Sequence, residues 1–400
     1  MPLCGDDTPL MSVKNQICGW FVLFLACASA AGQTAEWADT ARLKLLFVGD
    51  VMGHDSQIES AAIKKDSFYD YSPCFEYVEP LLRQADLSVA NLEVTLPGKP
   101  PYTGYPQFRS PDDLALALRY AGFDLLVTAN NHSNDSGKDG VIHTIDALDK
   151  LFFLHTGTFQ SEEERKAFYP LIVYKGVFKL AFLNYTYGTN GLVTKPPVIV
   201  NEIDEARIEA DLKEARELEP DFVIVVMHWG NEYQRKEVSE QSDLALKMFQ
   251  WGADMVIGSH PHVVQPVKTY SLEREGEKKE FLVAYSLGNF ISAQTKENTD
   301  GGMIFEVELS KPVTGRTAWV SDHAYTLVWR YIRKEPEGGK TFLTIPIAPF
   351  EGEDNPLGLP ESDYKAMLRF ARSTRALLSQ FQSKERKPAA NEILPPTVNR

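Results

Sequence analysis

The chain has 400 residues and carries 55 acidic and 41 basic side chains, which gives a formal net charge of −14 at pH 7. This acidic balance argues against non-specific binding to nucleic acid or to an anionic membrane surface, so no nucleic-acid partner is expected. The length allows two or three domains, and the composition is that of a soluble globular protein.

The N-terminal segment has the features of an export signal. Lys14 precedes an apolar run at residues 17–28, and small residues follow it, which predicts a secretory signal peptide over residues 1–31. This apolar run is shorter than the roughly 20 residues that a transmembrane helix needs. The four residues that end at Cys27 also resemble a bacterial lipobox, so lipid anchoring through Cys27 is the alternative to free export into the periplasm or cell envelope.

Cysteine usage limits the kinds of site that the exported chain can form. Cys74 is the only cysteine beyond residue 31. The mature chain therefore has no internal disulfide and no cysteine-rich zinc site. Any metal ion has to be bound by His, Asp, Glu or Asn side chains.

Apolar runs and amphipathic stretches alternate along most of the chain. Buried strands are predicted at residues 43–48, 87–90, 124–128, 222–227, 255–257 and 281–285. Helices are predicted at residues 75–84, 110–122, 140–152, 202–217 and 239–251. The alternation predicts an α/β fold with a largely parallel sheet, in which the carboxyl ends of the strands meet at one edge.

The domain organisation follows from the same pattern. Residues 32–42 form a polar linker, and residues 43–310 form the main domain. Residues 311–382 are predicted to be a β-rich C-terminal extension with a final helix. Residues 383–400 are polar and contain proline, which predicts a disordered tail.

Five of the predicted strands end in a loop that carries potential metal ligands. In chain order the ligand-type residues are Asp50, Asn91 and Glu93, Asn131 and His132, His228, and finally His260 and His262. A single Asp or Asn at such a position is often only a helix cap or a turn residue. Random turns would not select His, Asp, Glu and Asn five times, so the set favours one shared cleft.

The chemistry of this set suits one or two divalent cations. Imidazole, carboxylate and amide ligands fit Zn, Mn or Fe better than Ca. Two metals in such a cleft could hold a phosphoryl or carboxyl oxygen. A histidine that is not a ligand could act as general acid.

The stretch at residues 258–262 (Gly-Ser-His-Pro-His) is the densest part of the set. Gly258 is expected to let the backbone turn sharply at the end of a strand, and Pro261 fixes the chain between the two imidazoles. The alternative is a polar turn with two exposed histidines. A further group of four residues are candidates for substrate binding, namely His54, Asn91, Arg109 and Asn289.

Six segments of the chain resemble the CapA family, bacterial capsule-synthesis proteins that are called PgsA in poly-γ-glutamate systems. They are residues 49–52 (GDVM), 91–93 (NLE), 129–133 (ANNHS), 228–233 (HWGNEY), 258–262 (GSHPH) and 285–290 (YSLGNF). That family looks like a branch of the calcineurin-like metallophosphoesterases. The resemblance implies a four-layer αββα sandwich, metallo-dependent phosphatase-like, with the ligand-bearing loops along one edge.

The resemblance also implies roles for single residues. Asp50 matches the first metal-binding aspartate of the phosphoesterases, and Glu93 falls where their bridging aspartate is expected. Asn131 and His132 match their Asn-His pair, in which His132 is the proton donor. The last metal histidines correspond to His228, His260 and His262. Two departures are the missing Asp-x-His at the first strand and the Asn-Leu-Glu that replaces Gly-Asp-x-x-Asp at the second.

The implied function is capsule or poly-γ-glutamate biosynthesis or export at the cell envelope, with a metal-dependent phosphoesterase-like site. The implied substrate is an anionic polymer, a phosphoester or an amide. The alternative is a non-catalytic polymer-binding or scaffolding subunit of a membrane synthase complex.

Overall fold

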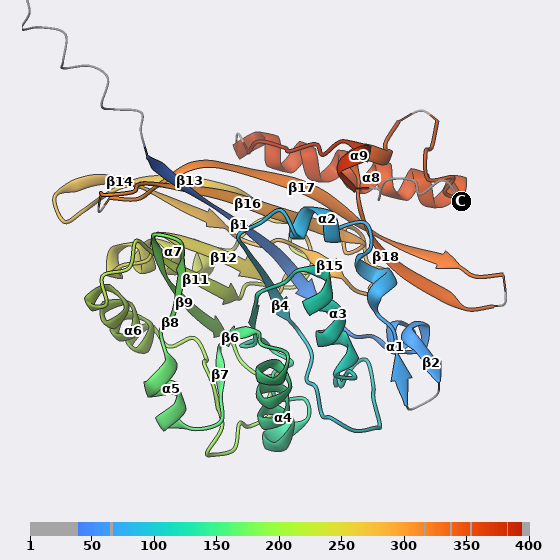
Figure 1. The fold of residues 1–400 in the computed structure, drawn as a ribbon, viewed down its shortest axis with the longest axis horizontal. Helices are drawn as coiled ribbons and strands as arrows, with labels where there is room; N and C mark the ends of the chain where they lie inside the picture. Colours follow the sequence, from blue (N-terminus) through green and yellow to red (C-terminus); the bar gives the residue numbers. More distant parts are fainter. Residues whose placement is uncertain are drawn as a thin grey trace, which may run out of the picture. The chain divides into compact units, whose positions relative to one another are not determined.

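Two large β-sheets form the core of the protein, as the computed structural model shows (Figure 1). The structure describes residues 39–64, 67–315, 317–336, 338–352, 354–381 and 383–393. The predicted signal peptide over residues 1–31 and most of the predicted linker lie outside the described residues. From Thr40 onward the chain forms one structural unit.

The first sheet is mixed. In spatial order it contains β18 (Lys340–Pro346), β17 (Trp319–Lys334), β16 (Gly301–Pro312), β1 (Thr40–Val51), β4 (Leu87–Leu92), β5 (Leu125–Val127) and β6 (Leu154–Thr156), with β15 (Asn289–Ile291) also paired to β1. The strands from β1 to β6 run parallel, whereas β16, β17 and β18 pair in antiparallel fashion.

The second sheet has four parallel strands between two antiparallel edges. Its order is β13 (Val267–Arg274), β14 (Glu277–Ala284), β12 (Met255–Ser259), β11 (Phe222–His228), β9 (Phe178–Thr186) and β8 (Leu171–Lys175). Two separate short pairs are β2 (Ala62–Lys64) with β3 (Phe68–Tyr69), and β7 (Thr158–Phe159) with β10 (Ile199–Val200).

Helices connect and cover these sheets. They are α1 (Asp55–Ala61), α2 (Glu79–Leu82), α3 (Asp113–Ala121), α4 (Gly137–Lys150), α5 (Glu162–Phe168), α6 (Glu205–Glu217), α7 (Ser239–Trp251), α8 (Glu361–Leu378) and α9 (Ala390–Ile393), with short 3₁₀ helices η1 (Ser72–Phe75), η2 (Ala348–Phe350) and η3 (Ser379–Phe381). In the part of the chain that the structure describes, no helix has the length and apolar character needed to cross a membrane.

Side-chain alternation in the second sheet places it between two apolar layers. Ile224 of β11 joins the core that contains Phe47 of the first sheet. The next residue, Val225, points to the other face and packs in the core that contains Leu212 of α6 and Met248 of α7. Successive residues of a strand point to opposite faces of its sheet, so β11 faces the first sheet on one side and two helices on the other.

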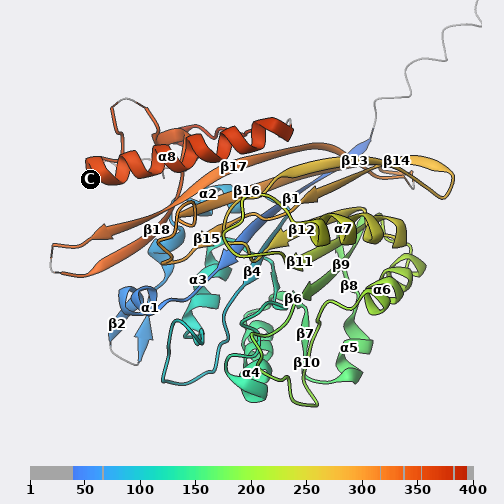
Figure 2. The same cartoon turned by 180° about the vertical axis from the view of Figure 1, so that it is seen from behind.

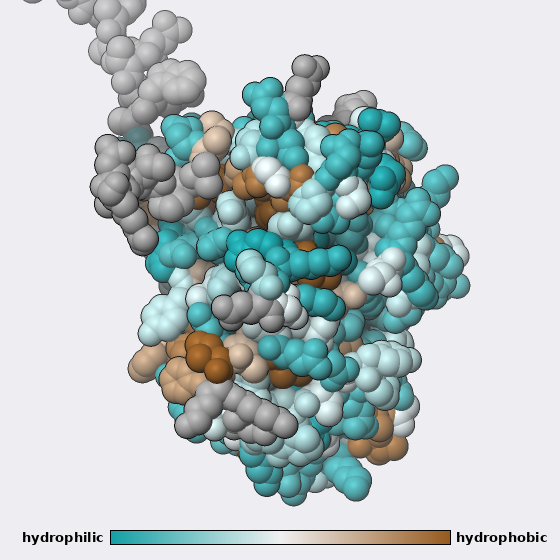
Figure 3. Space-filling model, turned by 90° about the vertical axis from the view of Figure 1, so that its right-hand side faces the viewer, coloured by the Kyte–Doolittle hydropathy of each residue, from teal (hydrophilic) through white to brown (hydrophobic). Residues whose placement is uncertain are grey.

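Helices also cover the first sheet. Phe370 of α8 and Leu118 of α3 belong to the same apolar core as the strands of that sheet. Figure 2 shows α8 lying along β17. The layers are therefore helix, sheet, sheet, helix, which confirms the four-layer αββα arrangement. On the side of the molecule seen in Figure 3, hydrophilic residues predominate and the hydrophobic ones form small separate patches.

The ligand-bearing strands do not belong to one parallel sheet, as the alternation pattern suggested. Strands β1, β4 and β5 are in the first sheet, whereas β11 and β12 are in the second. Alternation of strands and helices predicts parallel pairing but carries no information about which sheet a strand joins. The residues predicted as an extension at 311–382 supply β17, β18 and α8, and these two strands continue the first sheet.

The prediction of a disordered tail over residues 383–400 does not describe residues 383–393. Nη1 of Arg386 lies 2.6 Å from Oε2 of Glu306, and the backbone N–H of Arg386 donates to the carbonyl of Tyr325. Ile393 is fully buried. An ion pair to β16 and one buried apolar side chain thus hold this segment on the first sheet, and residues 394–400 lie outside the described part.

Candidate metal centre

The carboxyl ends of β1 and β4 in the first sheet meet those of β11 and β12 in the second. Nδ2 of Asn91 donates to Oδ1 of Asp50 at 2.8 Å and lies 3.2 Å from Nδ1 of His228. Nδ1 of His262 lies 3.0 Å from Oδ2 of Asp50. All four residues are buried, so ligand-type side chains from both sheets form one cluster.

The end of β1 is shaped by the close approach of the segment that leads into β15. A Cβ atom on Gly49 would lie 1.8 Å from the carbonyl oxygen of Gly288, so only glycine fits there. The backbone N–H of Asp50 donates to that same carbonyl at 3.0 Å. This contact places Asp50 beside Asn289, which is paired with it across the two strands.

Asn289 and Asp50 together fix the tautomer of His262. Nδ1 of His262 lies 3.0 Å from Oδ2 of Asp50 and 3.1 Å from Oδ1 of Asn289, and both oxygens are acceptors. Nδ1 therefore carries the proton, and Nε2 keeps its lone pair for a ligand. Nε2 faces Oε1 of Glu93 at 3.8 Å.

Asn289 was predicted to bind substrate, and this role does not fit its surroundings. The side chain is fully buried, and its Nδ2 donates to Oε1 of Gln294 and to the carbonyl of Thr299, both at 2.9 Å. With its oxygen engaged by His262, the whole amide is used inside the protein. Asn91 is likewise buried between Asp50 and His228, so both amides orient neighbouring side chains.

Glu93 is the least satisfied polar residue of the cluster. It is fully buried, and neither carboxylate oxygen has a hydrogen-bond partner. Oε1 lies 3.6 Å from Nε2 of His228 and 3.8 Å from Nε2 of His262. Burial, followed by the charge of Asp50, raises the pKa of Glu93 well above its usual value. A buried carboxyl group with no partner is unfavourable, and a cation would provide the missing partner.

His228 is held by polar groups at both ring nitrogens. Nε2 lies 2.8 Å from Oδ1 of Asn131, and Nδ1 lies 3.0 Å from Oγ of Ser259. Burial lowers the pKa of His228 well below its usual value, and the neighbouring histidines add to this. A neutral imidazole is the form that binds a metal ion.

The two histidines after β12 have unusual backbone conformations. His260 has φ of +96° and His262 has φ of +58°, values that residues other than glycine rarely adopt. Such conformations cluster at functional sites, where the surrounding structure maintains them. Nδ1 of His260 is buried without a hydrogen-bond partner, and burial lowers the pKa of this histidine to about 3. The alternative of two exposed histidines in a polar turn is wrong, because both side chains are buried.

Gly258 has a different role from the sharp turn that its position suggested. Strand β12 continues through it to Ser259. A Cβ atom on Gly258 would lie 1.9 Å from the carbonyl oxygen of Tyr285. Glycine is thus required here for the close approach of two chain segments.

Two overlapping sets of three side chains have the geometry of a metal site. In each set the potential ligand atoms lie within 4.8 Å of one another; the sets are Glu93, His260 and His262, and Asp50, Glu93 and His228. Glu93 and His260, which both have buried atoms without a hydrogen-bond partner, belong to these sets. A donor set of imidazoles and carboxylates with unsatisfied buried atoms fits a divalent cation of the Zn, Mn or Fe type.

His132 lies on the wall of the same cluster and is oriented by a residue that the sequence analysis did not single out. Nδ1 of His132 lies 2.7 Å from Oδ2 of Asp135, so the carboxylate keeps the proton on Nδ1. The backbone N–H of His132 donates to Oδ1 of Asn130 at 3.0 Å. Asp135 is three residues further in the same Asn- and Asp-rich run, and that spacing is the signal that could have identified it.

His54 and Arg109 differ in how close they come to the cluster. The ring of Phe108 packs between His54 and His132, at centroid distances of 4.9 Å and 4.5 Å. Nδ1 of His54 accepts from the backbone N–H of Ala293 at 3.2 Å. Nε of Arg109 instead donates to the carbonyl of Pro101 at 3.2 Å, and no contact in the described part of the chain joins it to the ligand-type residues.

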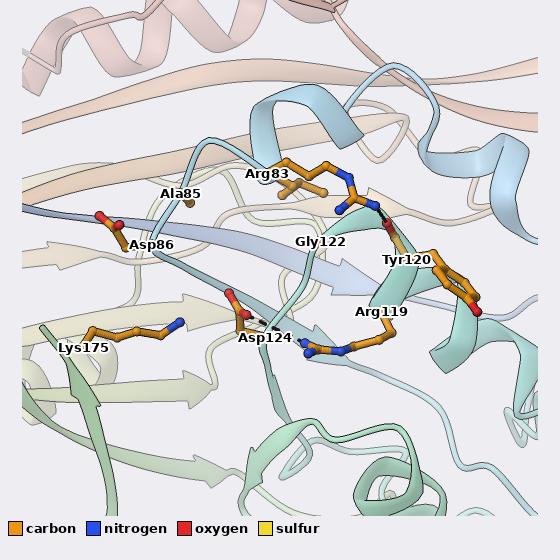
Figure 4. A pocket seen from close by; sticks show the side chains of 9 residues that line it. Arg83, Ala85, Asp86, Arg119, Tyr120, Gly122, Asp124 and Lys175 are labelled. Atoms are coloured by element: carbon orange, nitrogen blue, oxygen red, sulfur yellow. Dashed lines mark hydrogen bonds and ion pairs between the residues drawn. The ribbon is translucent and has the colours of Figure 1, made fainter.

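Two cavities lie at different distances from this cluster. One of about 350 Å³ is lined by residues that include Tyr187 and Trp229, and the ring of Tyr187 lies 4.5 Å from that of His260. A second, of about 490 Å³, lies at the amino ends of β4 and β5, near Asp86 and Asp124 (Figure 4). In that cavity Nη1 of Arg119 lies 3.8 Å from Oδ1 of Asp124, so the opposite charges of these two lining residues partly neutralise each other.

A protein-family model matches the segments that build this centre. The family model described as bacterial capsule synthesis protein PGA_cap matches residues 44–294. The chain belongs to this family. The PGA_cap match contains every ligand-type residue from Asp50 to Asn289, whereas β17, β18 and α8 lie beyond it.

Two similar proteins have names that refer to PGA or capsule biosynthesis. The PGA biosynthesis protein CapA of Bacillus subtilis (strain 168) is 28% identical over 293 residues, which are 68% of this chain and 70% of that protein. The capsule biosynthesis protein CapA of Bacillus anthracis is 29% identical over 288 residues, 67% of this chain and 64% of that protein. A solved structure described as a novel phosphatase of Mycoplasma pneumoniae covers 72% of this PGA_cap chain and 94% of its own, at 13% identity and a TM-score of 0.36, a likeness too weak to support an argument.

Proposed function

We propose that this protein acts at the cell envelope in the biosynthesis or export of a capsule or of poly-γ-glutamate, with a divalent-metal centre in its cleft. Membership of the PGA_cap family and the names of the two relatives support the biosynthetic role. The observation that carries the metal centre is Glu93, a buried carboxylate without partners beside His228 and His262. Export, with Cys27 as a lipid anchor in the alternative, rests on the sequence of residues 1–31.

Five side chains would hold the metal, namely Asp50, Glu93, His228, His260 and His262. When bound, a divalent metal supplies a Lewis acid that polarises a phosphoryl or carboxyl oxygen. The remaining polar residues orient these five. Asn289 keeps the proton of His262 on Nδ1, and Asn131 holds the ring of His228.

His132 is the residue of this chain that would move a proton. Asp135 holds its Nδ1, which leaves Nε2 for the substrate. In the hydrolysis of a phosphoester or an amide, Nε2 would deliver a proton to the leaving group as it departs. Asn130 fixes the backbone of His132 and therefore the direction of its ring.

Elemental analysis of the purified chain tests the metal centre. The wild type is expected to contain about one to two equivalents of Mn, Fe or Zn, and the double variant Asp50→Ala/His260→Ala is expected to lose them. The matched control is Asp149→Ala/His155→Ala. These two residues lie away from the cleft, and Nε2 of His155 is 3.0 Å from Oδ1 of Asp149. A wild type without metal after reconstitution, or a cleft variant that keeps it, contradicts the proposal.

A second candidate function is a non-catalytic subunit that binds an anionic polymer or acts as a scaffold in a membrane synthase complex. The departure at the first strand favours it, because buried Val51 and Met52 follow Asp50 where the phosphoesterase pattern has a histidine. In that case His132→Ala would restore polymer production in a deletion strain as well as the wild type does. Loss of production with normal folding would favour the enzyme.

A further inference from the structure

The cavity of about 350 Å³ beside the candidate metal centre has walls from three segments of the chain. Tyr187 follows β9, residues 229–231 follow β11, and the remaining wall comes from the first turns of α7 and from Ile203. The cavity thus lies at the carboxyl ends of two parallel strands. This is the edge of the sheet at which α/β proteins commonly bind their ligands.

Tyr187 belongs both to this cavity and to the surroundings of the ligand-type histidines. Its ring lies 4.5 Å from the ring of His260 and stacks on that of His228, with the centroids 6.3 Å apart and the planes at 11°. Trp229, on the cavity wall, directly follows His228, and its backbone N–H donates to the carbonyl of Ser259 at 3.1 Å. A ligand in the cavity would therefore lie next to a group bound at the metal centre.

The cavity can be reached from solvent. Tyr187 is 46% exposed, and Asn231 and Glu240 on its walls are exposed as well. Other parts of the wall are buried and apolar, with Trp229 and Leu244 as examples. An accessible mouth and an apolar interior are the features of a small-molecule site. The volume is near the lower end of the usual range of about 300–1,000 Å³, so the cavity has room for one small unit of a substrate.

The polar groups inside the cavity are engaged, whereas those at its mouth can accept a ligand. Nε1 of Trp229 donates to a backbone carbonyl at 3.0 Å, and both ends of the Gln241 amide have hydrogen-bond partners. The side chain of Asn231 makes no hydrogen bond to any residue that the structure describes. Its amide offers donors and an acceptor, and the carboxylate of Glu240 offers further acceptors.

The charge of the lining restricts what can bind. Among the described residues that line the cavity there is no Lys, Arg or His, and Glu240 is the one charged side chain. A carboxylate or phosphate in the cavity would face this negative charge and find no cation to pair with. An uncharged group with hydroxyls at its edge fits better, because the hydroxyls can bond to Asn231 and Glu240 while the C–H face packs on the ring of Tyr187.

We propose that this cavity is a sugar subsite, which binds an uncharged pyranose unit of the substrate beside the metal centre. The inference rests on the proposed function and names the substrate class as a saccharide, whose phosphoryl or carboxyl group is held by the metal. Poly-γ-glutamate does not fit the cavity, because every repeat of that polymer carries a carboxylate. The subsite thus favours a saccharide capsule, or a glycosyl precursor of one, over poly-γ-glutamate.

Saturation-transfer NMR titrations, carried out with and without EDTA, test this subsite. The neutral probes are glucose, galactose and N-acetylglucosamine, and glucuronate and galacturonate are the acidic matches of the first two. At least one neutral sugar is expected to bind with a Kd of about 1–10 mM, the range for a ligand of this size. Each uronate is expected to bind at least about tenfold more weakly than its neutral parent, because the lining offers its carboxylate no cation.

A cavity-filling variant shows whether the sugar binds at this place. Ile203→Trp is expected to weaken sugar binding more than about tenfold, because the larger side chain occupies the cavity. Ile172→Trp is the matched control, since Ile172 is also partly buried against the same apolar core but does not line the cavity. If Ile203→Trp does not fold, the exposed Asn231→Ala replaces it, with a loss of about fivefold to tenfold for one hydrogen bond.

Three results would overturn the proposal: no neutral sugar binds, the uronates bind as tightly as their parents, or Ile203→Trp and Ile172→Trp bind sugar equally well. Metal content is measured on the same samples. A protein without metal that still loses sugar binding on Ile203→Trp would contradict the metal centre and support the sugar subsite. A metal-loaded wild type that binds none of the sugars would support the metal centre and contradict the subsite.

Discussion

Oε1 of Glu93 lies 3.6 Å from Nε2 of His228, and neither oxygen of this fully buried carboxyl group accepts a hydrogen bond. The two residues come from different sheets, Glu93 from the end of β4 and His228 from the end of β11. Their approach is what turns two separate strand ends into one potential ligand set.

Glu93→Gln is expected to bind metal at least tenfold more weakly while folding as well as the wild type. The substitution keeps the size of the side chain and replaces a carboxyl group that has no hydrogen-bond partner in the metal-free protein, so stability in EDTA should not fall. The comparison is Asp211→Asn, because Asp211 is also buried but pairs with Arg165 and Tyr185. That variant should lose about 1–3 kcal/mol in a denaturant titration. Equal losses for both variants would contradict the prediction.

Asp135→Asn is expected to reduce polymer production in a deletion strain while metal content stays unchanged. The amide oxygen carries no negative charge, so it holds Nδ1 of His132 more weakly than the carboxylate does and orients the ring less firmly. Oδ2 of Asp135 also accepts from the backbone of Phe108 at 2.6 Å, and an amide oxygen can still do so. Full production by a folded variant would speak against general acid chemistry at His132.

The thiol of Cys74 is expected to be unreactive in the folded protein and to make stability depend on alkaline pH. Burial raises its pKa from 9.0 to about 12. The folded state therefore favours the thiol, and this contribution is complete below pH 9 and is lost as pH rises toward 12. The difference in unfolding free energy between wild type and Cys74→Ala should narrow over this range. A thiol reagent at pH 8 should label Cys74 only in denaturant, and a difference that does not change with pH would contradict the pKa shift.

Gly258→Ala is expected to destabilise the protein by about 1–3 kcal/mol or more and to weaken metal binding. The added methyl group would lie 1.9 Å from the carbonyl of Tyr285, so β12 has to shift, and His260 and His262 shift with it. Gly352→Ala is the control, because a Cβ atom there meets no atom within 4 Å. Melting temperatures and metal content of both variants test this, and a neutral Gly258→Ala would show that the segment can adjust.

Elements with strong local signals could be predicted from the sequence. The helix predicted at residues 239–251 has the bounds of α7, because an amphipathic stretch there ends at Gly252, which adopts φ of +136°. The strand predicted at residues 222–227 is one residue shorter than β11. Both segments are defined by their own composition and need no information from distant parts of the chain.

Edge strands and sheet membership could not be predicted in this way. Strand β13 alternates between partly buried and exposed residues and carries charges, so it lacks an apolar run. It is stabilised by antiparallel pairing with β14. Which strands share a sheet depends on packing between distant segments, and this information is not in any one of them.

For the site, the sequence could predict which residues gather there. It could not predict which of them are free to bind a ligand and which orient their neighbours. Six candidate ligands and His132 gather as expected, whereas the metal and proton-transfer roles stay predictions. Asn289 turned out to orient His262, because its buried amide is used by neighbours on every side.

The division of the ligands between the two sheets has a consequence for when the centre can come into being. Asp50 and His262 are 212 residues apart and meet only after the sheets have packed on each other. An unfolded chain thus presents no preassembled coordination sphere. A metal ion would therefore bind after folding, and its identity would be set by the supply in the compartment where folding finishes more than by intrinsic affinity order. A bound cation would then link side chains of the two sheets and stabilise their packing on each other.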